Sequence, residues 1–264
     1  MSNQRRRNEK IINQVLTFFS TASATGKTTL AINFAADLAE RGYRVCLADC
    51  DMQFGDVANC LGLEPETSFY QMYEDDEVNA ANLVEETPWG FDVLAAPSEL
   101  DEGYLITESN TTRAINHLRA NYDYVVVDTC TGFSPITMAV LEQTDILFIP
   151  CVVDFIPSIK NLKQGLDNLQ KMQFDANRVR LILNRNKADT QISTKDVEGL
   201  LGKGFQYFIH NDYAGMMESI KKAQPIVLFQ KENKVADEIS NIIAVELGDK
   251  EAEKSNGIFS WLWK

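Results

Sequence analysis

The segment from Val15 to Asp51 constrains the fold of this chain more than any other. An apolar run (VLTFF) is followed by the loop STASATGKTT, a helical pattern and a second apolar run that ends in ADCD. A loop between a strand and a helix directs successive backbone N–H groups, and the N-terminus of the helix, at a bound anion. The segment therefore predicts a phosphate-binding loop, in which Lys27 contacts the β and γ phosphates and the Thr28 hydroxyl binds Mg²⁺.

The predicted loop contains a single glycine. The usual pattern GxxxxGK(S/T) begins with glycine, where this chain has Thr21, and only Gly26 remains. A GK(S/T) triplet alone is weak evidence, because average residue usage produces it in about one chain in ten of this length. Here the triplet follows a strand pattern and opens a helix pattern, which is the context that a phosphate-binding loop requires.

Carboxylates end two further apolar runs. Asp49 and Asp51 follow VCLA, and Asp128 ends YDYVVVD. Ligands of open parallel sheets gather beyond the carboxyl ends of the strands, so we expect one of the first two near Mg²⁺ and the other near an attacking water. Asp128 is expected to accept a hydrogen bond from a water bound to Mg²⁺, and Gly132 to let the backbone approach the γ-phosphate. The alternative is that these residues form ordinary polar turns.

The pattern of apolar runs predicts the fold class. At 264 residues with 45% hydrophobic content, the chain can bury a large core. Near-continuous apolar strands that alternate with helices indicate a single α/β domain, with a mostly parallel sheet and helices on both faces. Helices are expected over Thr28–Arg41, with Gly42 as its C-terminal cap, and over Ser158–Met172. The expected strands are VLTFF, VCLA, FDVLAA, YVVVD, ILFIPCVV, VRLILN and FQYFI.

Charge and cysteine content restrict the partners and the compartment. The net charge of −13 opposes non-specific DNA binding, so DNA is an unlikely partner. The five cysteines form no CxxC pair and are expected to be reduced, which favours a cytoplasmic protein. We find no pattern of a signal peptide or of a membrane-spanning helix. His117 and His210 are interpreted as exposed residues without a catalytic role.

The two ends of the chain differ in composition from the rest. Residues 1–13 are predicted to be a basic tail, residues 14–247 the domain, and residues 248–264 a charged spacer with an amphipathic end. The last eight residues, Gly257–Lys264, read GIFSWLWK. Such a segment could lie on a membrane surface, with nucleotide-dependent attachment through two tails of a dimer. Alternatively it packs on its own domain or on a partner.

The sequence resembles the MinD/ParA family of P-loop ATPases. The resemblance covers about Gln14 to Leu247 and rests on GKTTLAINFAADLAERGYRVCLADCD, YDYVVVDTCTG and LILNRNK. Within that family, DMQFGDVANCLGL, FDVLAAP and ELDE are most similar to the CpaE/TadZ branch, which takes part in the assembly and polar placement of type IVb pili. The resemblance implies a P-loop NTPase fold, ATP and Mg²⁺ as ligands, and a homodimer that forms around ATP.

The resemblance also implies roles for individual residues. Lys27 and Asp51 would be catalytic, with Asp51 orienting the hydrolytic water. Thr28, Asp49 and Asp128 would hold the metal. The nucleotide would contact the loop and the end of the VRLILN run, where Asn184 would recognise the adenine edge, through Ala24, Thr25, Gly26, Lys27, Thr28, Thr29, Gly132, Asn184 and Arg185.

The loop departs from the family pattern at one charged position. The early lysine of KGGxGKT, which reaches into the partner's site in the family, aligns with Ala22. Loss of that charge removes stabilisation of the transition state. Two functions are therefore carried forward: a slow ATPase that positions or assembles a pilus or secretion apparatus, peripherally at the inner face of the membrane, and a nucleotide-dependent scaffold without turnover. A ParA-like DNA partitioning ATPase is a third alternative.

Overall fold

The centre of the molecule is one eight-stranded sheet in the order β3-β4-β2-β5-β1-β6-β7-β8. The computed structural model describes residues 12–153, 156–186 and 192–249. Neighbouring strands are parallel, except that β3 is antiparallel to β4 at one edge. The strands are β1 (Gln14–Ser20), β2 (Val45–Cys50), β3 (Glu85–Glu86), β4 (Asp92–Leu94), β5 (Tyr124–Thr131), β6 (Ile146–Cys151), β7 (Val179–Asn186) and β8 (Tyr207–His210).

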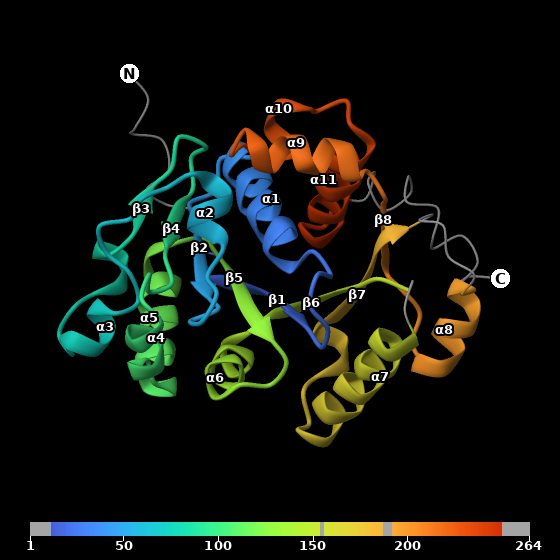
Figure 1. The fold of residues 1–264 in the computed structure, drawn as a ribbon, viewed down its shortest axis with the longest axis horizontal. Coiled ribbons are helices and arrows are strands. Elements are labelled where there is room, and N and C mark those ends of the chain that lie inside the picture. Colours follow the sequence, from blue (N-terminus) through green and yellow to red (C-terminus); the bar gives the residue numbers. More distant parts are fainter. Residues whose placement is uncertain (1–11, 154–155, 187–191, 250–264) are drawn as a thin grey trace.

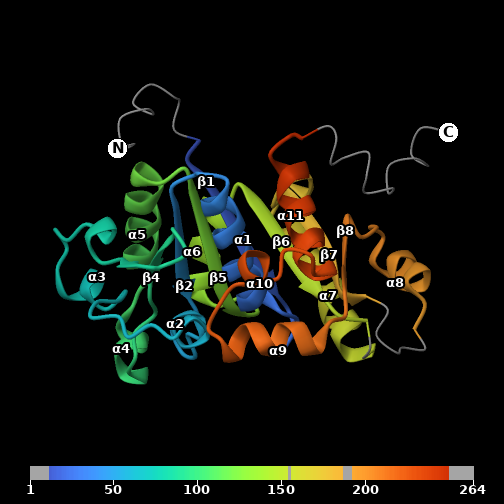
Figure 2. The same cartoon turned by 90° about the horizontal axis from the view of Figure 1, so that it is seen from above.

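Helices cover both faces of this sheet (Figures 1 and 2). Helices α1, α2, α10 and α11 contribute to the core on one face, and α5, α6, α7 and α8 to the cores on the other. The helices are α1 (Lys27–Glu40), α2 (Val57–Leu61), α3 (Gln71–Glu74), α4 (Leu100–Leu105), α5 (Glu108–Asn121), α6 (Pro135–Gln143), α7 (Ile156–Lys171), α8 (Thr194–Leu201), α9 (Tyr213–Lys221), α10 (Ile226–Phe229) and α11 (Lys234–Glu246), with the 3₁₀ turns Ala80–Asn82 and Ala176–Arg178.

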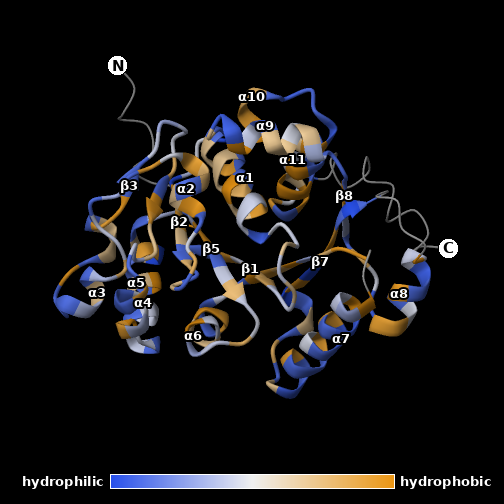
Figure 3. Cartoon of the chain, viewed as in Figure 1, coloured by the Kyte–Doolittle hydropathy of each residue, from blue (hydrophilic) through white to orange (hydrophobic). Residues whose placement is uncertain are grey.

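The strand that leads into the loop is anchored by a cluster of aromatic rings. Phe18 of β1 contacts Phe34 of α1, with ring centroids 4.9 Å apart, and Phe148 of β6 at 5.2 Å. All three side chains are buried, and each such pair adds about 0.5–1.5 kcal/mol beyond the burial of apolar area. Hydrophobic residues run along β1 and β7 in the centre of Figure 3. The cluster therefore fixes α1 against the sheet just beyond the loop.

The predicted fold class is confirmed, and each expected strand run overlaps an observed strand. The helix expected over Thr28–Arg41 spans Lys27–Glu40, and the one expected over Ser158–Met172 spans Ile156–Lys171. Gly42 follows α1 with φ of 89°, and the Tyr43 N–H donates to the Leu38 carbonyl, as a C-terminal glycine cap requires. Strand β3 was not predicted, because a strand of two residues has no periodicity.

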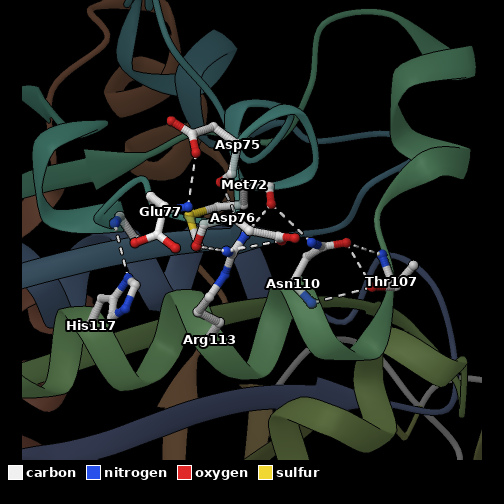
Figure 4. A network of polar contacts seen from close by, with 9 residues as sticks. Met72, Asp75, Asp76, Glu77, Thr107, Asn110, Arg113 and His117 are labelled. Carbon is white, nitrogen blue, oxygen red and sulfur yellow. Dashed lines mark hydrogen bonds and ion pairs between the residues drawn. The ribbon is translucent and has the colours of Figure 1, made fainter.

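The interpretation of His210 as an exposed turn residue is wrong. His210 is the last residue of β8, its side chain is only 22% exposed, and its Nδ1 contacts Glu238 of α11. Its other ring nitrogen lies 2.9 Å from Lys234 Nζ. His117 of α5 is also partly buried, and its Nδ1 accepts a hydrogen bond from the Ala80 N–H, drawn in Figure 4. Both histidines tie helices to neighbouring segments.

Both predicted tails lie almost wholly outside the described residues, including the basic run near the N-terminus and the segment Gly257–Lys264. Their boundaries stay predictions. Among the described residues, none of the helices has the length and hydropathy needed to cross a bilayer. The cysteines Cys46, Cys50, Cys60, Cys130 and Cys151 are free thiols.

Candidate nucleotide-binding site

The predicted phosphate-binding loop connects β1 to α1 at the carboxyl edge of the sheet. It runs from the end of β1 at Ser20 to Gly26, and α1 begins at Lys27. No side chain caps the start of α1. The first backbone N–H groups of a helix have no partner within the helix, so those of α1 are directed at the space that an anion would occupy.

Gly26 is required by its conformation and by a close neighbour. Its φ is 94°, which L side chains rarely adopt. A Cβ atom on Gly26 would lie 2.4 Å from Nδ2 of Asn184, at the end of β7. That same nitrogen donates a 2.8 Å hydrogen bond to the carbonyl of Thr25. Asn184 therefore holds the loop backbone, a contact that its predicted role in adenine recognition did not foresee.

Two residues of the loop–helix junction contact the end of β5. The Thr28 hydroxyl donates to Asp128 Oδ2 at 2.6 Å, and Lys27 Nζ donates to the Thr131 hydroxyl at 3.3 Å. Thr131 was absent from the predicted site residues. It lies three positions after Asp128 in the same strand, so the signal was present but a threonine at a strand end is too common to single out.

Asp49 and Asp128 occupy paired positions on β2 and β5. Each is 1% exposed. Both oxygens of Asp49 accept backbone hydrogen bonds of 3.1 Å, from the N–H groups of Asp51 and Val57. In contrast, Asp128 Oδ1 is buried and has no hydrogen-bond partner among the described residues. The two carboxylates are therefore close together with one acceptor unpaired.

Burial dominates the titration of this pair. It raises the pKa of Asp128 to about 7, although the Thr28 hydroxyl and Lys27 act in the opposite direction. Burial, followed by the charge of Asp128, also raises the pKa of Asp49 well above its ordinary value. A divalent cation would favour the ionised forms. Because hard cations take oxygen ligands, the unpaired oxygen, the carboxylates and the Thr28 hydroxyl together fit Mg²⁺.

Asp51 lies at the start of the turn that follows β2. Its Oδ1 accepts hydrogen bonds from the N–H groups of Gln53 at 3.4 Å and Phe54 at 3.2 Å. Within the described part of the chain no hydrogen bond joins Asp51 to Lys27 or Thr28. The structure brings Asp51 to the same edge of the sheet and places it in the polar turn that was the alternative interpretation.

The remaining predicted residues surround the loop in different ways. Gly132 has φ of 85°, and its N–H donates to the Ser20 carbonyl at 2.8 Å. Ala24 and Arg185 also have positive φ, of 58° and 52°, which is uncommon and strained for residues other than glycine. The Thr29 carbonyl accepts a hydrogen bond from Asn33, one turn further along α1.

Thr21, which stands where the general pattern has glycine, packs against α7. A Cβ atom on Gly165 of that helix would lie 2.4 Å from the Thr21 methyl carbon. A glycine inside a helix costs about 1 kcal/mol relative to alanine, so its presence signals a close approach. The sequence contained this signal, but nothing in it named Thr21 as the neighbour.

The parallel sheet, the loop between β1 and α1, and the strand-end carboxylates define a P-loop nucleotide-binding fold. Residues 13–181 match the model of a family described as "AAA domain", and the chain belongs to this family. Its relatives lie in the MinD/ParA group of P-loop ATPases. They include the cell division protein PomZ of Myxococcus xanthus, 28% identical over 69% of this chain and 61% of PomZ, and the chromosome partitioning protein ParA of Caulobacter vibrioides, 31% identical over 62% of this chain and 65% of ParA.

The chain thus spans less than two thirds of the length of either relative. Solved structures agree on the fold. A ParA family ATPase from Chlorobium tepidum superimposes with a TM-score of 0.80, at 22% identity over 88% of this chain and 98% of that one. MinD of Pyrococcus horikoshii, solved with Mg-ADP, superimposes with a TM-score of 0.77, at 19% identity over 93% of this chain and 99% of that one.

Proposed function

We propose that this chain binds ATP with Mg²⁺, dimerises around the nucleotide and hydrolyses it slowly. The observation that carries the proposal is the contact of Lys27 and Thr28, at the start of α1, with Thr131 and Asp128 at the end of β5. Both side chains would exchange these partners for phosphate oxygens and a metal ion when a nucleotide binds. The relative solved with Mg-ADP supports the choice of ligand.

The residues divide into three roles in this proposal. Lys27 and the first N–H groups of α1 bind the phosphates, and Mg²⁺ neutralises their charge. Thr28 and Asp128 hold the metal or its waters, with Asp49 beside them. Asp51 orients the attacking water. The residues Ala24, Thr25, Thr29, Gly132, Asn184 and Arg185 complete the nucleotide contacts.

We place the chain in the spatial positioning or assembly of a pilus or secretion apparatus. The support is the similarity of the segment DMQFGDVANCLGL to the CpaE/TadZ branch. Names of relatives such as PomZ and ParA refer to cell division and to chromosome partitioning, so spatial organisation is the common theme. Peripheral attachment to the inner face of the membrane through Gly257–Lys264 belongs to the same proposal, and that segment lies outside the described residues.

ATP turnover and self-association test this proposal together. Phosphate release is measured with and without anionic vesicles, and sedimentation velocity is measured with ATP or ADP. We expect slow turnover and an ATP-dependent dimer, both lost in Lys27→Ala. Lys222→Ala, which removes an exposed lysine of α9's C-terminal end, is the matched control and should change neither. Turnover no faster than that of Lys27→Ala, with vesicles present, would reject the enzymatic part.

Ala22 favours a second candidate, a nucleotide-dependent scaffold without turnover. The residue is partly buried and uncharged at the position where the family carries a lysine. A scaffold predicts ATP binding and dimerisation without ADP, and Ala22→Lys should then raise phosphate release. Accumulation of ADP over several turnovers by the natural sequence would reject the scaffold. Salt-sensitive binding to random duplex DNA would instead support the partitioning alternative, which the net charge of −13 disfavours.

A further inference from the structure

The acidic residues of this chain are concentrated in one segment. Between Arg44 and Arg113 the sequence contains 16 Asp and Glu residues and no Lys, Arg or His. The rest of the chain carries 22 acidic and 25 basic residues. The whole excess of negative charge therefore comes from this segment, which runs from β2 to the start of α5.

This segment forms one end of the molecule. It contains the edge strand β3, its neighbour β4 and the short helices α3 and α4, which lie beyond β2 in both cartoon views (Figures 1 and 2). The opposite end, with β7, β8 and α8, carries basic side chains such as Arg180, which pairs with Glu246. The charge is therefore distributed unevenly along the sheet.

Large apolar side chains are exposed at the same end. Phe54 is 74% exposed and Tyr104 is 69% exposed, and Leu100 and Tyr73 are also exposed. Leu100 and Tyr104 are four residues apart in α4, so they lie on one side of that helix. A cluster of this kind on an otherwise charged surface is typical of a site for another macromolecule.

Helix α4 packs closely on the turn that follows β2. A Cβ atom on Gly103 would lie 2.0 Å from the carbonyl oxygen of Met52. Helix α4 is thus pressed against the turn that carries Phe54, while Leu100 and Tyr104 of the same helix remain exposed. Helix α4 therefore presents apolar residues to solvent beside another exposed ring.

Helix α3 continues this surface. The rings of Tyr70 and Tyr73 are stacked, with centroids 6.0 Å apart. Burial, and then the carboxylates of Glu74 and Glu102, raise the pKa of Tyr70, and α3 and α4 lie at the same end of the molecule in Figures 1 and 2. We call this region the acidic aromatic surface and define it by Phe54, Tyr73, Glu74, Glu99, Leu100, Asp101, Glu102 and Tyr104.

The carboxylates at α4 differ in their ion pairs from those of the acidic loop, by which we mean residues 75–79 between α3 and the 3₁₀ turn Ala80–Asn82. In that loop, Asp76 pairs with Arg113 at 3.1 Å, and Arg113 also donates to the carbonyls of Met72 and Asp75 (Figure 4). Among the described residues, Glu99, Asp101 and Glu102 form no ion pair. The charge of the acidic loop is partly neutralised within the chain, whereas that of α4 remains available to a partner.

From this combination we infer that the acidic aromatic surface binds a cationic, partly apolar segment of another protein. Guanidinium groups can stack on Tyr73 and Tyr104 and pair with the neighbouring carboxylates, while apolar side chains cover Phe54 and Leu100. The surrounding negative charge repels an anionic membrane, a nucleic acid and the same surface of a second copy. Nothing in this recognition requires a nucleotide, so it is independent of the proposed ATPase function.

Binding of a synthetic peptide tests the inference on the full chain without nucleotide. The probe is a fluorescent peptide of five Arg-Leu-Ser repeats, and the comparison peptides replace Arg by Glu or by Ser. We expect only the Arg peptide to bind, with an affinity that falls as salt rises. Glu99→Lys/Asp101→Lys should weaken binding by about tenfold or more, and so should Leu100→Ser/Tyr104→Ser, which leaves the charge unchanged.

Glu64→Lys/Glu66→Lys is the matched control. These two exposed residues lie in the same acidic segment but follow Gly62, which packs against Ala223 on the other side of the molecule. The control makes the same change in net charge and should keep most of the affinity. Equal loss in both charge variants would mean general attraction to an acidic protein and would overturn the inference, as would an absence of binding.

Two further outcomes identify a different occupant. If removal of residues 1–11 strengthens binding of the Arg peptide to the natural sequence, the chain's own basic tail covers the surface, and no partner is needed. If Leu100→Ser/Tyr104→Ser abolishes self-association measured by sedimentation velocity, a second copy covers it. Either result would replace the inferred partner.

Discussion

The two sides of the phosphate-binding loop are built from different kinds of contact. Towards β2 and β5, functional groups of the loop–helix junction contact carboxylates and hydroxyls, as Thr28 does with Asp128. Towards β7 and α7, the loop is held by a backbone hydrogen bond and by close packing. Asn184 donates to the Thr25 carbonyl, and the absence of a side chain on Gly165 leaves room for Thr21. The first set of contacts must change when a nucleotide binds, whereas the second can persist and keep the loop in position.

The largest effect on stability is expected at Gly26, on the side where close packing holds the loop. Gly26→Ala forces a left-handed conformation on alanine, at about 1–2 kcal/mol, and places Cβ 2.4 Å from Asn184 Nδ2, at about 1–3 kcal/mol more for overpacking. The free energy of unfolding should therefore fall by about 2–5 kcal/mol in urea denaturation.

Gly202→Ala is the control for this substitution. Gly202 also has a positive φ, of 69°, but a Cβ there would meet no atom within 4 Å. The free energy of unfolding of this variant should fall only by the cost of the left-handed conformation, about 1–2 kcal/mol. In the Asn184→Ala background, Gly26→Ala should cost only this conformational part, because the close contact is gone. Equal losses at Gly26 and Gly202 would show that the contact with Asn184 does not restrict the loop.

The next effect is the pH dependence of stability that comes from Asp49 and Asp128, on the side of the loop towards β2 and β5. In the unfolded chain aspartates titrate near pH 4, while in the folded chain the pKa of Asp128 is about 7 and that of Asp49 is also raised. Between these values the folded state holds protons that the unfolded state has lost. This contribution to stability is therefore complete below about pH 4 and is lost as the pH rises through about 7.

Urea denaturation at several pH values, in the presence of a chelator, measures this change. Asp128→Asn keeps the size of the side chain and cannot ionise, so relative to the natural sequence it should gain stability as the pH rises from about 4 to about 7. Mg²⁺ should reduce that gain, because a cation favours the ionised pair. Asp196→Asn, on the exposed side of α8, is the control. A pH-independent difference for Asp128→Asn would contradict the raised pKa.

A smaller effect separates the observed contact of Asn184 from its predicted role. Asn184→Ala removes one hydrogen bond to the loop, worth about 1 kcal/mol. If Asn184 acts by holding the loop, affinities for fluorescent ATP and GTP analogues should fall by the same factor, about tenfold at most. If it recognises adenine, only the preference for ATP should disappear. Asn186→Ala, in the same strand, controls for general damage to β7.

Sequence reasoning was most informative where chemistry and chain order coincide. The β1–loop–α1 unit, Gly42 and the acidic strand ends could be predicted, because a P-loop and a parallel sheet place them by local pattern and by chain direction. The contacts of Asn184 with Thr25 and of Gly165 with Thr21 could not. They depend on how closely β7 and α7 approach the loop, which is set by packing of residues far apart in sequence. The environment of His210 was predicted wrongly for the same reason, since its partner Glu238 belongs to α11, a helix that follows later in the sequence.

The smallest effect tests whether α7 helps to shape the loop. In Gly165→Ala, alanine favours the helix by about 1 kcal/mol, but its Cβ would lie 2.4 Å from the Thr21 methyl, so a net loss of about 1 kcal/mol is expected from overpacking. Gly199→Ala, at a helical glycine of α8 with no atom within 4 Å, should instead gain about 1 kcal/mol. Thr21→Ser removes the methyl group and should convert the loss at Gly165 into a gain. If Gly165→Ala is as stabilising as Gly199→Ala in the natural background, α7 does not constrain Thr21, and the shape of the loop depends on Asn184 and Gly26 alone.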